Sequence, residues 1–214
     1  MLYFFILDGP EFLETIGPAL AQSWQRRSFE PCRELCAALV PRAKGFFPGS
    51  EHGQHQLLVE QVGRGLTFDR RFWQPLVGEV LMYSAIAVPR LETAAETLCC
   101  LLAPEHFRDR VTARARLAAI QQAHFGSRDL VFGGGHYRPE SAGWNDTDEV
   151  ARLADYLAAQ TPEQWTSAGL ASLEVYDDSE REAELDYARH WFLPLCDMYR
   201  DARDAGQIIV CEDL

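Results

Sequence analysis

The sequence predicts an α+β fold, a mostly helical single domain over residues 1–214 with a small sheet formed partly by its N- and C-terminal strands. Three observations support this prediction. A chain of 214 residues with 47% hydrophobic and 24% charged residues is typical of a soluble globular protein with a substantial core. Apolar residues recur at three- and four-residue steps through much of the chain, which favours amphipathic helices. Short apolar segments at the two ends favour β-strands instead.

The first half of the chain combines one strand with helices separated by glycine or proline. The strand is expected over 2–7, before the turn residues Asp8, Gly9 and Pro10. Segment 97–104 fits either a buried strand or a helix, and we favour the helix. The other expected helices are 11–16 and 19–27 on either side of Gly17-Pro18, 32–40 ending before Pro41, 54–62 ending before Gly63, 69–88 with Asp69 as N-cap, 104–107 and 112–125.

The last third of the chain carries helix-capping signals. A capping box pairs an N-cap side chain with a carboxylate or amide three residues later. Pairs with this spacing are Asp146 and Glu149, Thr161 and Gln164, and Ser179 and Glu182. Long helices are expected over 147–160 and 179–205, with a kink at Pro194 because proline removes a backbone donor. Gly206 is expected to end the second of these helices, and 207–212 to form the terminal strand.

The two terminal strands are expected to lie in one sheet. The apolar side chains of 2–7 need a buried face, and a chain end stays ordered when it is tied into a sheet. The partner strand is expected near 208–211, and the helices at 69–88 and 179–205 are expected to cover a face of this sheet.

Three segments of the C-terminal third form a set of packing and capping motifs. They are 133-GGGHYRP-139, 148-DEVARLADYLAA-159 and 192-FLPLCDMYRDARDAGQIIV-210, with Phe192, Leu195, Tyr199, Ala202 and Gly206 as the matching positions of the last one. On these residues the C-terminal third resembles the YfbM-like family of small bacterial proteins of unknown function. The resemblance implies a fold and supplies no catalytic residues. It also suggests a subdivision into a mainly helical half, 1–128, and an acidic YfbM-like half, 129–214.

The net charge of −12 is concentrated toward the C-terminal end. Residues 1–138 hold 14 acidic and 15 basic residues, whereas residues 139–214 hold 18 acidic and 5 basic residues, a net of −13. A nucleic-acid or anionic-membrane binder needs a contiguous basic surface. We therefore expect neither as a partner, and the acidic end favours a basic protein partner instead.

The sequence shows no targeting or membrane signal. The longest apolar stretch, 80–89, is about half of the ~20 residues that a membrane helix needs. The apolar start at 1–10 has no positive n-region and no small-residue cleavage site, so a secretory signal is not expected. These features predict a cytoplasmic protein of bacterial type.

Cysteine and histidine spacing does not predict a metal or a cofactor. Cys32 and Cys36 are one helical turn apart, but no CxxC pair or matching Cys/His pair accompanies them. We expect all six cysteines to be reduced thiols, mostly buried. His52 and His55 lack the HExxH frame and fit a solvated loop.

The run of three glycines at 133–135 raises the question of a ligand site. It follows a short apolar segment, but a P-loop needs Lys and Ser/Thr after the glycines, and a dinucleotide fingerprint needs a helix that Pro139 disfavours. The flanking polar residues are His124, Ser127, Arg128, His136, Tyr137 and Arg138. They can form a small-ligand site on a loop, or the glycines can simply make a turn, which is the interpretation we favour.

Two functions follow from these patterns. The leading hypothesis is a non-enzymatic binding or interaction protein that meets a basic partner with its acidic C-terminal face. The alternative is a small-ligand-binding protein or enzyme with a site around 124–138.

Overall fold

The computed structural model describes residues 2–46, 57–91, 94–107, 114–174 and 177–213. The pair His52 and His55, and parts of the helices expected at 54–62 and 112–125, lie outside these residues. The described residues form helices over most of their length together with a small sheet, so the predicted α+β class is confirmed. In the same part of the chain, no helix is both long and apolar enough to cross a bilayer.

The chain forms two compact units that are interleaved in the sequence. Unit 1 contains residues 1–6, 89–129 and 140–214, and unit 2 contains residues 7–88 and 130–139. The chain therefore passes between the units at 6/7, 88/89, 129/130 and 139/140. The sequence suggested two halves with a single boundary at 128/129. The two units instead have four boundaries along the chain.

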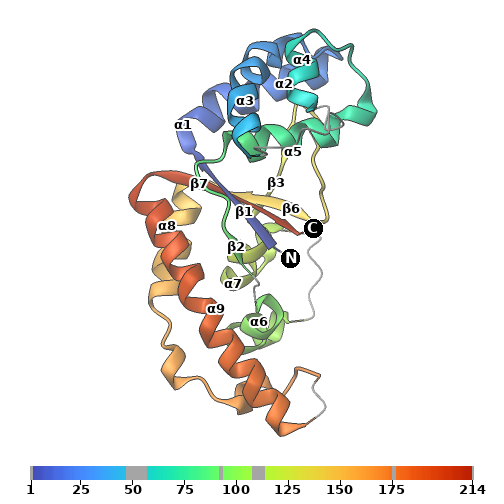
Figure 1. Ribbon diagram of the computed structural model, residues 1–214. Coiled ribbons are helices and arrows are strands. Elements are labelled where there is room, and N and C mark those ends of the chain that lie inside the picture. The colour runs from blue at the N-terminus through green and yellow to red at the C-terminus, as the bar shows by residue number, and fades with distance from the viewer. Residues whose placement is uncertain (1, 47–56, 92–93, 108–113, 175–176, 214) are drawn as a thin grey trace. The chain divides into compact units, whose positions relative to one another are not determined.

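Unit 1 is built on a five-stranded sheet with the strand order β2-β1-β7-β6-β3 (Figure 1). The strands are β1 (Leu2–Asp8), β2 (Arg90–Leu91), β3 (Arg128–Asp129), β6 (Ala142–Asn145) and β7 (Gln207–Asp213). The strands at the two chain ends are neighbours in this sheet, as predicted. β7 is the central strand and pairs antiparallel with β6, where Trp144 lies opposite Val210.

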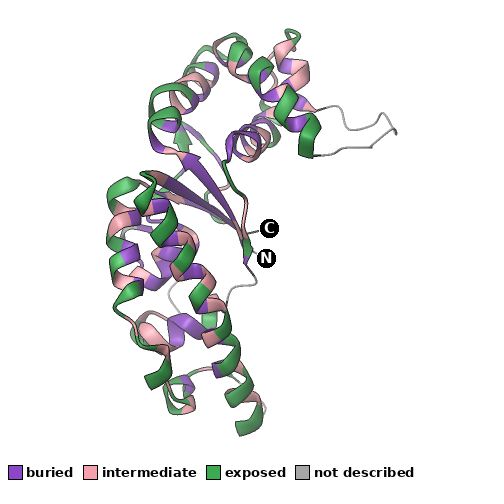
Figure 2. Ribbon diagram, turned by 60° about the vertical axis from the view of Figure 1, so that its left-hand side comes forward, coloured by how far each residue is buried: buried purple, intermediate pink, exposed green. Residues whose placement is uncertain are grey.

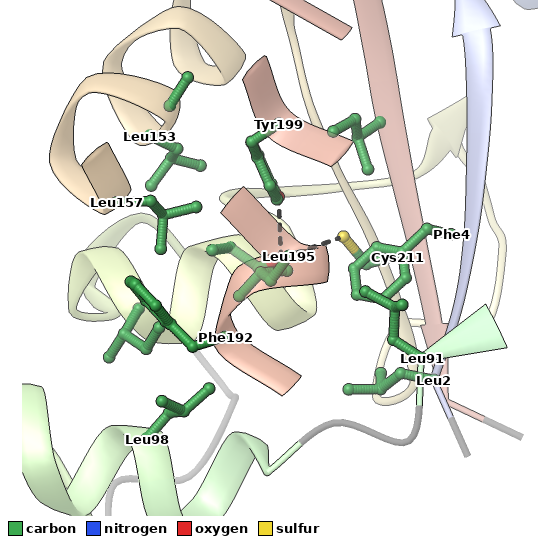
Figure 3. Packing of buried hydrophobic residues seen from close by; sticks show 14 of the residues in the cluster. Leu2, Phe4, Leu91, Leu98, Leu153, Leu157, Phe192, Leu195, Tyr199 and Cys211 are labelled. Atoms are coloured by element: carbon green, nitrogen blue, oxygen red, sulfur yellow. Dashed lines mark hydrogen bonds between the residues drawn. The ribbon is translucent and has the colours of Figure 1, made fainter. Parts of the chain in front are cut away.

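Four helices cover one face of this sheet: α6 (Ala95–Leu102), α7 (Ala119–Phe125), α8 (Thr147–Ala158) and α9 (Asp178–Asp204). Side chains alternate between the faces of a strand, so every second residue of β1 and β7 points to the helices. Those residues are Leu2, Phe4, Ile6, Ile209 and Cys211, and they join Leu98, Ile120, Leu153, Phe192 and Leu195 of the helices in one core (Figure 3).

The two long C-terminal helices were predicted, and one of their caps was predicted correctly. The backbone N–H of Glu149 donates to Asp146 Oδ1 at 2.9 Å and that of Asp146 donates to Glu149 Oε2 at 3.0 Å, which is the predicted capping box of α8. The N-cap of α9 is instead Asp177, whose Oδ1 accepts from the N–H of Glu180 at 2.9 Å. Ser179 is therefore not the cap, because its hydroxyl donates to Asp177.

Of the other signals predicted in the C-terminal third, the helix end at Gly206 is confirmed and the helix start at Thr161 is not. α9 continues through Pro194, and Gly206 follows it with φ +64, the left-handed residue predicted at the helix end. Thr161 makes no capping hydrogen bond, and only one 3₁₀ turn, Pro162–Gln164, follows it. The predicted helix start at Thr161 is therefore wrong.

Unit 2 is a helical unit with a small hairpin. It contains α1 (Gly9–Glu11), α2 (Gly17–Arg26), α3 (Arg33–Phe46), α4 (Leu58–Gly63), α5 (Trp73–Ser84), β4 (Val131–Phe132) and β5 (Gly135–His136). The helix expected at 69–88 is thus α5 of unit 2, and it ends at Ser84 because Ala85 is extended, with ψ 135. Asp69 is a cap as predicted, but of a 3₁₀ turn that precedes α5.

Two helix breaks predicted from proline are absent from unit 2. α1 passes through a π-helical turn, Phe12–Ile16, into α2. Pro18 lies in the first turn of α2, where a missing N–H is tolerated. α3 continues through Pro41, because its buried face extends past the proline to Ala43 and that packing offsets a cost of ~3 kcal/mol.

In the middle of the chain, the helix favoured at 97–104 is confirmed as α6. The helix expected at 104–107 is a 3₁₀ turn, and 112–125 is α-helical only over Ala119–Phe125. The short strands β2 to β6 were not predicted.

Candidate functional site

The six candidate residues around the glycine run divide between the two units. His124, Ser127 and Arg128 belong to unit 1, whereas His136, Tyr137 and Arg138 belong to unit 2. They do not form a cluster inside either unit. The small-ligand site expected from them stays a prediction.

His124 is a buried neutral imidazole near the C-terminal end of α7. Its side chain is 1% exposed, and Nδ1 lies 2.7 Å from the carbonyl oxygen of Ile120. Nε2 is buried and has no hydrogen-bond partner among the described residues. Burial lowers the pKa of His124 to about 4, although the hydrogen bond to Ile120 acts in the opposite direction. The imidazole is therefore uncharged at neutral pH.

Ser127 belongs to a buried polar network that sequence analysis did not find. Its N–H donates to Asn145 Oδ1 at 2.9 Å, and Asn145 Nδ2 donates to Tyr199 Oη and to the carbonyl of Gln122, both at 3.0 Å. Tyr199 Oη donates to the carbonyl of Ala123 at 2.8 Å (Figure 3). Every polar atom named here has a partner, so the network joins α7, β6 and α9.

Two features made this network hard to find. Asn145 opens a glycosylation-like NDT sequence, yet its side chain is fully buried. Tyr199 lies on the apolar face of α9, so its position in the sequence indicates an aromatic residue of the core and gives no sign of its hydrogen bonds. Burial raises the pKa of Tyr199 well above its usual value, so the hydroxyl remains a donor.

Arg128 is held by the cap of α8. Its guanidinium pairs with Asp146 and with Glu149, the latter at 3.1 Å, and it lies 5.6 Å from the centre of the Trp144 ring. The hydrogen bond to Glu149 raises the pKa of Arg128. This arginine therefore stabilises the capping box.

The glycine run forms a two-residue hairpin in unit 2. β4 and β5 pair antiparallel, with Phe132 opposite Gly135. Gly133 and Gly134 connect them with φ values of +60 and +92, as a type I′ turn requires. A Cβ atom on Gly133 would collide with the carbonyl of Ala21, and one on Gly135 would lie 2.6 Å from the Trp24 ring. The turn and its packing against α2 thus explain all three glycines.

The residues after the hairpin are fixed by Gln74 of α5. Gln74 Nε2 donates to the carbonyl of His136 at 2.8 Å, and its Oε1 accepts from the N–H of Arg138 at 3.1 Å. The His136 side chain is exposed, whereas Tyr137 is buried, with its hydroxyl beside Gly78. The Arg138 guanidinium lies 5.6 Å from the centre of the Tyr137 ring.

The cysteines agree with the prediction, because all six are free thiols and only Cys196 is less than fully buried. Among the described residues, no group of three or more His, Cys, Asp or Glu is arranged to hold a metal ion.

Unit 1 contains a pocket of about 530 Å³ between α6 and the start of α9. Four carboxylates line it, those of Glu96, Glu174, Glu180 and Glu184, together with the apolar side chains of Phe107 and Leu173. Thr97 donates its hydroxyl to Glu184 at 2.9 Å and thereby orients one of these carboxylates. A pocket of this composition disfavours anions and favours cations.

The excess of acidic residues belongs to one of the two units and is not simply a property of the C-terminal end of the sequence. Unit 1 holds 23 acidic and 11 basic residues, so its net charge is −12, whereas unit 2 holds 9 of each and is neutral. The whole net charge of the chain is thus carried by unit 1.

The fold and the charge together define an α+β protein whose candidate site is the acidic surface of unit 1. The chain is similar to the crystal structure of a protein of unknown function, YfbM from Escherichia coli, with 12% sequence identity and a TM-score of 0.45. The similarity covers 98% of this chain and 97% of that chain, so it is not confined to the C-terminal third as the motifs suggested. No family model and no curated protein matches the chain. A likeness at this level assigns no role to any residue.

Proposed function

We propose that this protein is a non-enzymatic binding protein that engages a basic protein partner through the acidic surface of unit 1. The observation that carries the proposal is the charge difference between the units, −12 against zero. Surface charge of one sign attracts partners of the opposite sign and speeds their association.

α9 contributes a large part of this surface. It holds eight acidic and four basic residues, a net of −4. Each of its arginines has a carboxylate partner close by, as in the pairs Arg189–Asp186 at 3.3 Å and Arg200–Asp197 at 2.7 Å. These pairs are exposed and hence weak, so a cationic partner can exchange with them. The excess carboxylates remain to attract that partner.

The experiment measures binding of a fluorescent arginine-rich peptide to the full chain by anisotropy, with a glutamate-rich peptide as the control ligand. We expect the arginine-rich peptide to bind at low salt and more weakly at moderate salt, because salt screens exposed charges over a Debye length of ~8 Å. The glutamate-rich peptide is expected not to bind.

Matched charge variants then locate the binding surface. Glu182→Gln, Asp186→Asn and Asp197→Asn together remove three exposed carboxylates from unit 1. Glu11→Gln, Glu14→Gln and Glu34→Gln remove three exposed carboxylates from unit 2 and change the net charge equally. The unit 1 variant is expected to weaken binding severalfold more than the unit 2 variant. Equal losses, or no binding of the arginine-rich peptide at low salt, would overturn the proposal.

A further inference from the structure

We propose that unit 2 binds a small monocarboxylic acid with an apolar body, in a pocket formed where α2 and α4 end. The pocket has a volume of about 240 Å³, and its lining residues come from two segments, 27–30 and 62–68. α2 and α4 each bury one face in unit 2 (Figure 2). The site belongs to the neutral unit and does not depend on the proposed function.

The floor of the pocket is apolar. Phe29 and Val62 line it and are 2% and 1% exposed. The Phe29 ring lies 4.9 Å from the Phe68 ring between centres, and Phe68 meets Trp24 edge-on at 6.4 Å. An engineered apolar cavity of about 150 Å³ holds benzene. A pocket of about 240 Å³ therefore has room for one ring with a short side chain.

The charged groups at the pocket leave one positive charge in excess. Arg27 lines the pocket, and its guanidinium makes no ion pair or hydrogen bond with the described residues. Glu30 also lines the pocket, but its carboxylate pairs with Arg33 at 3.4 Å. Arg33 Nε donates to the carbonyl of Gly63 at 3.2 Å, which holds this pair beside the end of α4. A guanidinium with no other partner binds a carboxylate through two parallel hydrogen bonds.

The backbone of Arg27 gives a second, independent reason to assign it to a ligand. Arg27 follows α2 with φ 50 and ψ 46, in the left-handed region where glycine or asparagine is usual at a helix end. Its backbone N–H donates to the carbonyls of Ser23 and Trp24, and glycine would make the same bonds without strain. Strained residues of this kind gather at functional sites. The guanidinium therefore explains why an arginine stands here.

The rest of the polar lining favours a ligand with a single carboxylate. The hydroxyls of Ser28 and Thr67 line the pocket as neutral groups. Ser28 Oγ accepts from the N–H of Glu30 at 3.2 Å, so its own O–H remains to donate to a carboxylate. A phosphate or a dicarboxylate would bring a second negative charge toward Glu30, which like charge disfavours.

The test uses phenylacetate as the probe, with phenylacetamide as its uncharged isostere and acetate as the acid without an apolar body. Calorimetry and amide NMR spectra of the full chain follow the binding. We expect phenylacetate to bind about tenfold more tightly than either control ligand, because only phenylacetate uses both the guanidinium and the apolar floor. The shifted amide signals are expected to concentrate in 27–30 and 62–68.

Variants at two neighbouring arginines separate the site from general charge. Arg27→Gln is expected to weaken phenylacetate binding about tenfold. Arg26→Gln removes the same charge from an exposed arginine that does not line the pocket, and is expected to keep wild-type binding. Arg27→Gly removes the guanidinium and relieves the backbone, so it is expected to lose binding while its melting temperature stays at or above that of wild type. Misfolding would not produce that combination.

Four results would overturn the inference. They are equal binding of phenylacetate and phenylacetamide, wild-type binding in Arg27→Gly, amide shifts concentrated outside the two lining segments, and no saturable binding of phenylacetate at millimolar concentrations. None of them concerns the arginine-rich peptide, so the site in unit 2 and the proposed function fail separately.

Discussion

Acidification is expected to destabilise this protein through His124. The unfolded imidazole has a pKa of about 6.5, whereas burial lowers the pKa of His124 in the folded protein to about 4. Between these values the unfolded chain binds a proton that the folded chain does not bind. Stability associated with His124 is therefore fully present above about pH 6.5, falls as the pH drops toward 4, and changes no further below that.

The size of the effect follows from the difference between the two pKa values. A shift of about 2.5 units corresponds to about 3 kcal/mol over the whole range, and about 2 kcal/mol of it is lost by pH 5. The side chain is almost completely buried, so solvent screening does not reduce this figure appreciably. Losses of this size are a large fraction of the 5–15 kcal/mol that typically stabilises a folded protein.

Urea unfolding at about pH 7.5 and pH 5 measures the effect in wild type and in His124→Asn. Asparagine keeps a donor near the carbonyl of Ile120 but does not titrate. Carboxylates titrate equally in both proteins, so the extra loss in wild type, about 2 kcal/mol, reports on His124 alone. His136→Asn removes an exposed histidine and is expected to keep the wild-type pH dependence. Equal pH dependence in wild type and His124→Asn would refute the reasoning.

Three further outcomes are expected. Tyr199→Phe removes the hydroxyl that donates to Ala123 and accepts from Asn145, and should lower the free energy of unfolding by about 1–3 kcal/mol in urea titrations; an unchanged midpoint would contradict the role of the network. Gly135→Ala places a Cβ atom 2.6 Å from the Trp24 ring and should lower the melting temperature, whereas Gly45→Ala, with open space around its Cβ, should leave it unchanged or raise it; equal shifts would contradict this account of the hairpin. Deletion of residues 207–214 removes the central strand of the unit 1 sheet and should abolish cooperative melting of unit 1; a truncated protein that melts like wild type would contradict that topology.

Sequence signals predicted the fold where local chemistry and burial agree. The box of Asp146 and Glu149 and the apolar stripe of α9 belong to helices that pack a buried face on the core, and the structure confirms them. Gly206 after α9 is exposed, and its positive φ confirms it as the residue that ends the helix. The terminal strands were also predictable, because an apolar segment such as 2–7 has no stable place outside a sheet.

Prolines produced two wrong helix breaks, at Pro18 and at Pro41. Pro41 lies inside a helix whose apolar stripe continues beyond it, so tertiary packing outweighs the lost donor. Pro194 was expected to kink a helix without ending it, and α9 does continue through it. Pro18 lies in the first turn of α2, directly after the π-helical turn Phe12–Ile16. The presence of a proline in the sequence does not show whether it lies in a first turn or in a helix that tertiary packing continues.

The short strands were missed because pairing partners, and not the local sequence, define them. β6 contains the tetrapeptide AGWN, which has no alternating pattern, and it becomes a strand because β7 and β3 lie on either side. Gly143 in this strand packs against the carbonyl of Phe125, a contact that depends on the folded unit.

The candidate site was predicted only in its charge. The acidic excess was visible in the sequence, but its assignment to one unit depends on crossings that interleave distant segments.

Carbodiimide cross-linking with a lysine-rich basic peptide tests the central claim most directly, because it joins peptide amines to the carboxylates they contact. Mass spectrometry then identifies the linked residues of the full chain. We expect cross-links at Glu182, Asp186 and Asp197 of α9, with a much lower yield at moderate salt. Cross-links at Glu11, Glu14 or Glu34 of unit 2 at the same yield would contradict it.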